Sequence, residues 1–99
     1  MDLATATDNL RTKVGADCGL NATLKFDCGA DGVVVIDGAS TPNSVSNTDR
    51  DTDCTIALTT DTLGDLMTGE VDPTTAFMTG RIKVSGDMSV ALKLQRVLG

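Results

Sequence analysis

The feature that most constrains the fold is a strict alternation of apolar and polar residues from position 20 to 28. The apolar positions are Leu20, Ala22, Leu24, Phe26 and Cys28. A period of two predicts a strand with one buried and one solvated face. The Gly-Ala-Asp-Gly segment at 29–32 is typical of a turn, and the β-branched run at 33–36 completes a predicted hairpin. Because that run has no polar interruption, we expect the second strand to be covered on both faces.

Helical spacing precedes the hairpin. Apolar residues recur every three or four positions between residues 2 and 14, which predicts an amphipathic helix ended by Gly15. Residues 38–53 are polar, with one weak strand signal at 44–47. Alternation of Cys54, Ile56 and Leu58 predicts a further strand over 54–59.

Two helices and a last strand are predicted next. Thr60 or Asp61 can cap a helix that Gly69 ends, and Asp72 followed by Pro73 is a typical start of a second, short helix. Residues 81–85 alternate as a strand, and residues 88–98 form one helix with a wide apolar face. The order α-β-β-β-β-α-α-β-α indicates an α+β fold with a mostly antiparallel sheet.

Size and charge exclude several classes of protein. A chain of 99 residues predicts a single domain spanning 1–99. The net charge is -6 and the eight basic residues are scattered, so we expect no nucleic acid partner. No apolar run is long enough to span a membrane, and the first residues do not resemble a secretory signal. We therefore expect a cytoplasmic protein.

The absence of histidine restricts the chemistry further. It excludes Ser-His-Asp and Cys-His catalysis and any zinc site that uses histidine. Cys18, Cys28 and Cys54 form no C-x-x-C pair, and the latter two lie on apolar strand faces, as small core residues do. The acidic segment at 49–53 lacks the later ligands of a calcium loop and is predicted to be solvated. We expect no enzyme, no catalytic residue, no metal and no cofactor.

The C-terminal third carries a recognisable pattern. It reads LMTGEVDPTTAF at 66–77, MTGRIKVSGDM at 78–88 and ALKLQ at 91–95. This pattern resembles the sterol carrier protein type-two family, also called non-specific lipid-transfer proteins. The resemblance is specific over residues 61–98, whereas residues 19–60 agree only in strand order. The short polar connection after Gly38 and the absence of the tryptophan that many members carry in the second strand depart from the family and would alter one tunnel wall.

The resemblance implies a five-stranded, mostly antiparallel sheet covered on one face by helices, with an apolar tunnel between them. It implies non-catalytic binding and transfer of fatty acids, fatty acyl-CoA, sterols or related lipids. By position, the tunnel would be lined by Leu63, Leu66, Met67, Phe77, Met78, Ile82, Val84, Met88, Leu92 and Gln95. Gln95 would offer hydrogen bonds to the polar end of a ligand.

Several alternatives remain open. The domain could keep the fold and close the tunnel, as a structural or interaction module. It could also be an accessory domain that presents acyl-CoA to a lipid-metabolising enzyme. Transient membrane contact is expected to be weak at this net charge unless Arg81, Lys83, Lys93 and Arg96 form a basic face or bind an acyl-CoA phosphate.

Overall fold

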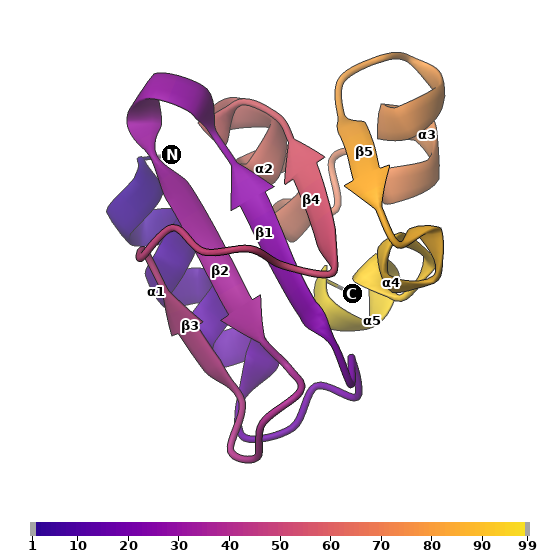
Figure 1. Cartoon of the computed structure of the whole chain (residues 1–99). Coiled ribbons are helices and arrows are strands. Elements are labelled where there is room, and N and C mark those ends of the chain that lie inside the picture. The colour runs from indigo at the N-terminus through magenta and orange to yellow at the C-terminus, as the bar shows by residue number, and fades with distance from the viewer. Residues whose placement is uncertain (1, 99) are drawn as a thin grey trace.

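The centre of the molecule is a five-stranded sheet in the order β3-β2-β1-β4-β5 (Figure 1). The computed structural model describes residues 2–98, apart from the side chains of residues 95 and 96. The strands are β1 (Thr23–Asp27), β2 (Val33–Asp37), β3 (Ser44–Ser46), β4 (Cys54–Ala57) and β5 (Lys83–Gly86). Neighbouring strands pair antiparallel except β1 and β4, which are parallel. The predicted α+β class and mostly antiparallel sheet are confirmed.

The hairpin predicted from the alternating pattern is β1 and β2. Phe26 lies opposite Val34 and Leu24 opposite Ile36, and all four side chains are fully buried on the inner face. Val35 points to the opposite face, because side chains alternate along a strand, and it is only 2% exposed. The expectation that the second strand is covered on both faces is therefore confirmed.

The segment 47–53 connects β3 to β4 across the outer face of the sheet (Figure 1). An ion pair of 2.7 Å between Lys25 Nζ and Asp49 Oδ1 ties it to β1. Its end is fastened by Asp53, whose carboxylate accepts hydrogen bonds from the backbone N–H and the hydroxyl of Thr23 at 3.0 and 3.1 Å. This crossing places β4 beside β1 in parallel, which a local sequence pattern does not indicate.

Helices pack behind the sheet and at its β5 end. Helix α1 (Leu3–Val14) begins at Asp2 and buries its predicted apolar stripe. Helix α2 (Thr60–Thr68) begins one residue earlier than predicted: the hydroxyl of Thr59, rather than a side chain at 60 or 61, accepts a hydrogen bond from the Thr62 N–H at 3.1 Å. Helix α3 (Pro73–Met78) starts at the predicted Asp72 cap.

The single helix predicted for residues 88–98 is wrong. The structure has α4 (Met88–Leu92) and α5 (Leu94–Leu98), separated at Lys93. There the Lys93 N–H donates to the Val90 carbonyl at 3.0 Å, a bond that tightens the turn and ends the α-helical pattern. The Lys93 ammonium reaches the Leu20 carbonyl at 3.3 Å, so the residue at the break is held against the chain before β1.

The last strand also differs from its predicted range of 81–85. The backbone N–H groups of Arg81 and Ile82 donate to the Ala76 carbonyl of α3 at 2.8 and 3.4 Å and are therefore not paired with β4. Pairing with β4 begins only at Lys83 and continues to Gly86, whose φ of 91° suits glycine. Within residues 2–98, none of the helices has the length and apolar character needed to cross a bilayer.

Candidate functional site

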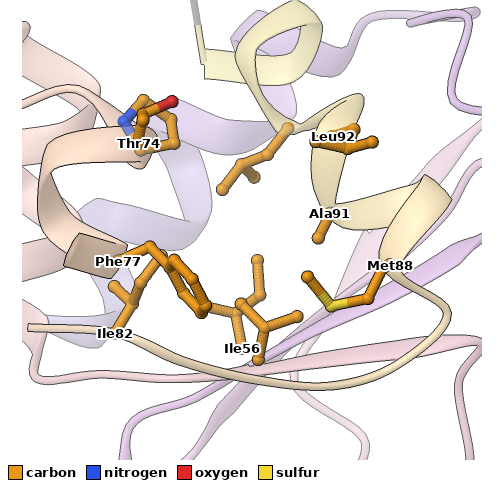
Figure 2. Close-up of a pocket in the computed structure, with 10 residues that line it drawn as sticks. Ile56, Thr74, Phe77, Ile82, Met88, Ala91 and Leu92 are labelled. Atoms are coloured by element: carbon orange, nitrogen blue, oxygen red, sulfur yellow. The ribbon is translucent and has the colours of Figure 1, made fainter. Parts of the chain in front are cut away.

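An apolar pocket lies between the β4–β5 end of the sheet and the helices α3, α4 and α5 (Figure 2). Its volume is about 210 Å³. It is lined by Ile56, Pro73, Thr74, Phe77, Ile82, Val84, Met88, Ala91, Leu92 and Leu94. Volumes of roughly 300 Å³ and more are usual for small-molecule sites, so this pocket is small as it stands.

Strand register forms the base of the pocket. Ile56 of β4 lies directly opposite Val84 of β5, so their side chains share the inner face. Ile56 is fully buried and Ile82 is 4% exposed, which makes this base part of the hydrophobic core. The base is therefore set by the sheet and does not depend on a ligand.

Two short helices form opposite walls. Helix α3 presents Pro73 and Phe77, which are four residues apart, and α4 presents Met88 and Leu92 at the same spacing. In Figure 2 the Phe77 ring and the Met88 thioether approach from the two sides above Ile56. Because side chains four apart share one helix face, each short helix contributes a whole face to the pocket.

Each of the two helices that wall the pocket begins with an aspartate N-cap. The Asp72 carboxylate accepts a hydrogen bond of 2.6 Å from the Thr75 N–H at the start of α3. The Asp87 carboxylate accepts from the hydroxyl and N–H of Ser89 at 2.6 and 2.9 Å at the start of α4. These bonds hold the pKa of each carboxyl below its ordinary value of 3.8, since they favour the charged form. Both caps are therefore charged at neutral pH.

The lining is suited to apolar ligands. Thr74 is the only residue with a polar side chain among the ten, and none of the ten is charged. The mouth is open, with Phe77, Met88 and Leu92 exposed by 52%, 49% and 81%. Such a surface binds a ligand by removing apolar area from water.

A second hollow of about 310 Å³ lies on the other side of Pro73, which lines both. It is bordered by Lys13, Leu66, Met67, Thr68, Gly69, Val71, Asp72, Pro73 and Leu98. At its border the Lys13 ammonium donates a hydrogen bond to the Leu98 carbonyl at 3.2 Å. With Lys13 and Asp72 on its border, this hollow is more polar than the pocket.

The ten residues expected from the resemblance are not all brought together. Five of them line the pocket: Phe77, Ile82, Val84, Met88 and Leu92. Leu66 and Met67 border the second hollow, and Leu63 is fully buried in the core. Met78 is 79% exposed and lines neither cavity. The side chain of Gln95 lies outside the described residues.

The sequence reasoning missed the other half of the lining. Ala91 and Leu94 could have been found, because Ala91 is three residues from Met88 and Leu94 follows in the same apolar pattern. For Pro73 and Thr74 the sequence indicates only a helix start and not a place in a pocket lining. Placing Ile56 in the lining requires the register between β4 and β5, which local sequence patterns do not predict.

Two of the three described basic side chains suggested for an acyl-CoA phosphate are already bonded within the protein. The Arg81 guanidinium pairs with the Asp65 carboxylate at 2.6 Å, and the Lys93 ammonium bonds the Leu20 carbonyl. Lys83 is exposed next to the lining residue Val84 on β5, so its side chain points to the other face of the sheet. The side chain of Arg96 is among those not described.

The other candidate features are structural. Cys54 is fully buried and Cys28 is 6% exposed, which confirms their prediction as small core residues. The residues at 49–51 and 53 are exposed, as expected for a solvated acidic segment. Among the residues that the structure describes, no three histidine, cysteine or acidic side chains are grouped to hold a metal ion.

Comparison with known proteins agrees with this geometry. The profile of the SCP-2 sterol transfer family matches residues 7–99. Sterol carrier protein 2 of Gallus gallus is 41% identical over 70 residues, which are 70% of this chain and 13% of that protein. Hydroxysteroid dehydrogenase-like protein 2 of Xenopus tropicalis is 53% identical over 34 residues, which are 34% of this chain and 8% of that one. The chain thus matches only a small part of the length of these relatives.

Solved structures share the fold. Sterol carrier protein 2 like 2 of Aedes aegypti superimposes with a TM-score of 0.76 and 20% identity, over 96% of this chain and 94% of that one. The palmitated form of that protein gives 0.73 and 20%, over 99% and 95%. The profile match, the relatives and the α+β architecture together show that this chain belongs to the SCP-2 sterol transfer family.

Proposed function

We propose that the chain binds an apolar lipid in the pocket between β5, α3 and α4 and transfers it without chemical conversion. The observation that carries this proposal is the lining, in which nine of the ten residues are apolar and none is charged. Membership of a sterol transfer family supports it. The palmitated state of the mosquito structure supports a fatty acyl chain as one kind of ligand.

The lining also supports an orientation for the ligand. A carboxylate or phosphate placed deep in the pocket would lose its hydration and find no cation there, which is unfavourable. We therefore expect fatty acids and fatty acyl-CoA to bind with the acyl chain inside and the charged end at the mouth. A sterol needs only a partner for its hydroxyl, and Thr74 offers one among the described lining residues.

The pocket volume supports a ligand that is held only in part, or a pocket that widens on binding. A long acyl chain is larger than about 210 Å³ permits as a fully enclosed guest. The exposed side chains at the mouth allow the remainder of the chain to lie along the rim. The hydrogen bond expected between Gln95 and the polar end of the ligand remains a prediction, tested by the affinity of Gln95→Leu.

The test is a titration of delipidated protein with a fluorescent fatty acid, followed by displacement with unlabelled palmitoyl-CoA and cholesterol. We expect saturable binding to the unmodified chain and loss of binding in Met88→Trp, which fills the pocket from α4. Met78→Trp is the matched control, because it makes the same substitution at an exposed position that lines neither cavity. Saturable binding that survives Met88→Trp unchanged would exclude this pocket.

A second candidate is an accessory domain that presents a lipid to an enzyme. The similarity to part of a hydroxysteroid dehydrogenase-like protein favours it, since the matching segment is a small part of that longer chain. Copurification of the chain with a lipid-metabolising enzyme, and a higher rate of that enzyme on the bound lipid, would support this role. The closed interaction module is the reading that remains if folded, delipidated protein binds no lipid.

A further inference from the structure

The large apolar side chains that remain exposed are concentrated on two helices. Among the described residues they are Phe77 and Met78 on α3 and Met88 and Leu92 on α4. Phe77, Met88 and Leu92 line the mouth of the pocket, so a ligand accounts for them. Met78 does not, although it is 79% exposed. Exposed apolar groups that gather in one place usually mark a contact surface.

The same two segments carry no charge. Residues 73–80 read PTTAFMTG and residues 88–92 read MSVAL, whereas 22% of the whole chain is charged. We call the surface formed by these two segments the α3–α4 face. Its polar groups are threonine and serine hydroxyls, which are compatible with the interface of a bilayer as well as with water.

The charges near the α3–α4 face decide which lipid surface it suits. The caps Asp72 and Asp87 are carboxylates, Arg81 is already paired with Asp65, and Lys93 is bonded to a backbone carbonyl. No basic cluster surrounds the face among the described side chains, and the net charge of the chain is -6. An anionic membrane would repel such a protein, so its association must come from apolar burial.

We propose that the α3–α4 face docks on a zwitterionic lipid bilayer with the mouth of the pocket turned toward the lipid. This proposal rests on the proposed function, since it describes how the lipid enters and leaves. Met78, which follows Phe77 at the end of α3, enters the boundary between headgroups and acyl chains together with the exposed parts of Phe77, Met88 and Leu92. A lipid that passes between these side chains moves from the bilayer to the pocket without exposing its apolar part to water. A protein seated on the same face would close that route.

A single tryptophan tests the docking directly, because the chain has no tryptophan and no tyrosine. Met78→Trp places an indole on the α3–α4 face, and Ala4→Trp places one on the exposed side of α1. With vesicles of phosphatidylcholine, we expect the emission of Met78→Trp to shift to shorter wavelength and that of Ala4→Trp to stay unchanged. No shift in Met78→Trp, or equal shifts in both variants, would overturn the proposal and leave the face to a protein partner.

A charge substitution tests whether docking serves transfer. We expect Met78→Asp to slow transfer of a fluorescent lipid from phosphatidylcholine vesicles by about tenfold, since it puts a carboxylate where docking would bury an apolar side chain. Ala4→Asp adds the same charge on α1 and should leave the rate unchanged. Replacing a third of the lipid by phosphatidylserine should weaken binding at low salt, and tighter binding would contradict the charge argument.

Ligand affinity in the absence of vesicles separates the two proposals. If the unmodified chain binds the lipid but Met78→Trp shows no shift, the docking proposal fails and the proposed function stands. If the folded, delipidated chain binds no lipid, the proposed function fails whatever the vesicles show. Met78→Asp should keep the affinity of the unmodified chain, because Met78 does not line the pocket.

Discussion

Truncation of Leu92 tests whether this side chain contributes to ligand binding and not to the stability of the fold. Leu92 is 81% exposed and lies at the mouth of the pocket, so Leu92→Ala removes very little buried area from the free protein. We expect its free energy of unfolding to change by no more than about 0.5 kcal/mol, as for other exposed positions. The midpoint of thermal unfolding should therefore move by only a few degrees.

The effect on binding should be much larger. The substitution removes three carbon atoms, which contribute about 0.8 kcal/mol each when fully buried. A ligand that covers the exposed 81% of this side chain would thus lose about 2 kcal/mol of binding free energy, or about 30-fold in Kd. Fluorescence titration with a fatty acid analogue measures this change in the absence of membranes.

Met78→Ala provides the control for this measurement. Met78 is 79% exposed on α3 but lines neither of the two cavities described above, so its truncation should alter Kd by no more than about twofold. Equal losses in the two variants would mean that the probe adheres to exposed apolar surface in general. An unchanged Kd in Leu92→Ala would refute binding at this mouth.

Three further predictions follow from the same structure. A lipid at 100 times its Kd should raise the free energy of unfolding by about 2.7 kcal/mol, seen in calorimetry as a rise of roughly 10 °C or more in the melting midpoint; an unchanged midpoint would argue against a specific site. Because the folded-state pKa values of Asp72 and Asp87 lie below 3.8, their caps stabilise α3 and α4 above that pH and are lost as the pH falls below it. A neutral sterol probe should therefore stay bound down to pH 3.8 and dissociate as the pH falls further, and less so from a variant with Asn at both positions, since Asn caps without titrating. Burial raises the pKa of the Cys28 and Cys54 thiols, so iodoacetamide should label the more exposed Cys18 first, as mass spectrometry of digested protein would show; prior labelling of Cys54 would contradict its burial.

Elements with a local signal were predictable from the sequence. The alternation from Leu20 to Cys28 and the turn after it determine the hairpin, because period-two burial and turn chemistry act between near neighbours. Asp72 followed by Pro73 marks the start of α3 for the same reason. The break at Lys93 has no such local signal, since no glycine or proline stands between residues 88 and 98.

Predicting the candidate site required more than periodicity. An apolar residue near a pocket can line it, belong to the core or face water, and periodicity does not distinguish these outcomes. Leu63, Phe77 and Met78 were all expected at the tunnel, yet Leu63 is fully buried, Phe77 lines the pocket and Met78 points to solvent. The difference arises from how α2 and α3 pack on the sheet. Ile56 enters the pocket only because β4 pairs with β5 opposite Val84.

The connection that places β4 beside β1 also separates the part of the chain that supports the sheet from the part that lines the pocket. Among the side chains that the structure describes, every residue that lines the pocket falls between Ile56 and Leu94, whereas α1, β1, β2 and β3 supply none. The first half is therefore a support that a redesign of ligand preference can leave untouched. Conversely, the support cannot be completed without the second half, because the edge of β1 stays unpaired until β4 has been synthesised. Preference for a lipid can thus vary through the lining residues between Ile56 and Leu94, while the opening hairpin keeps its register.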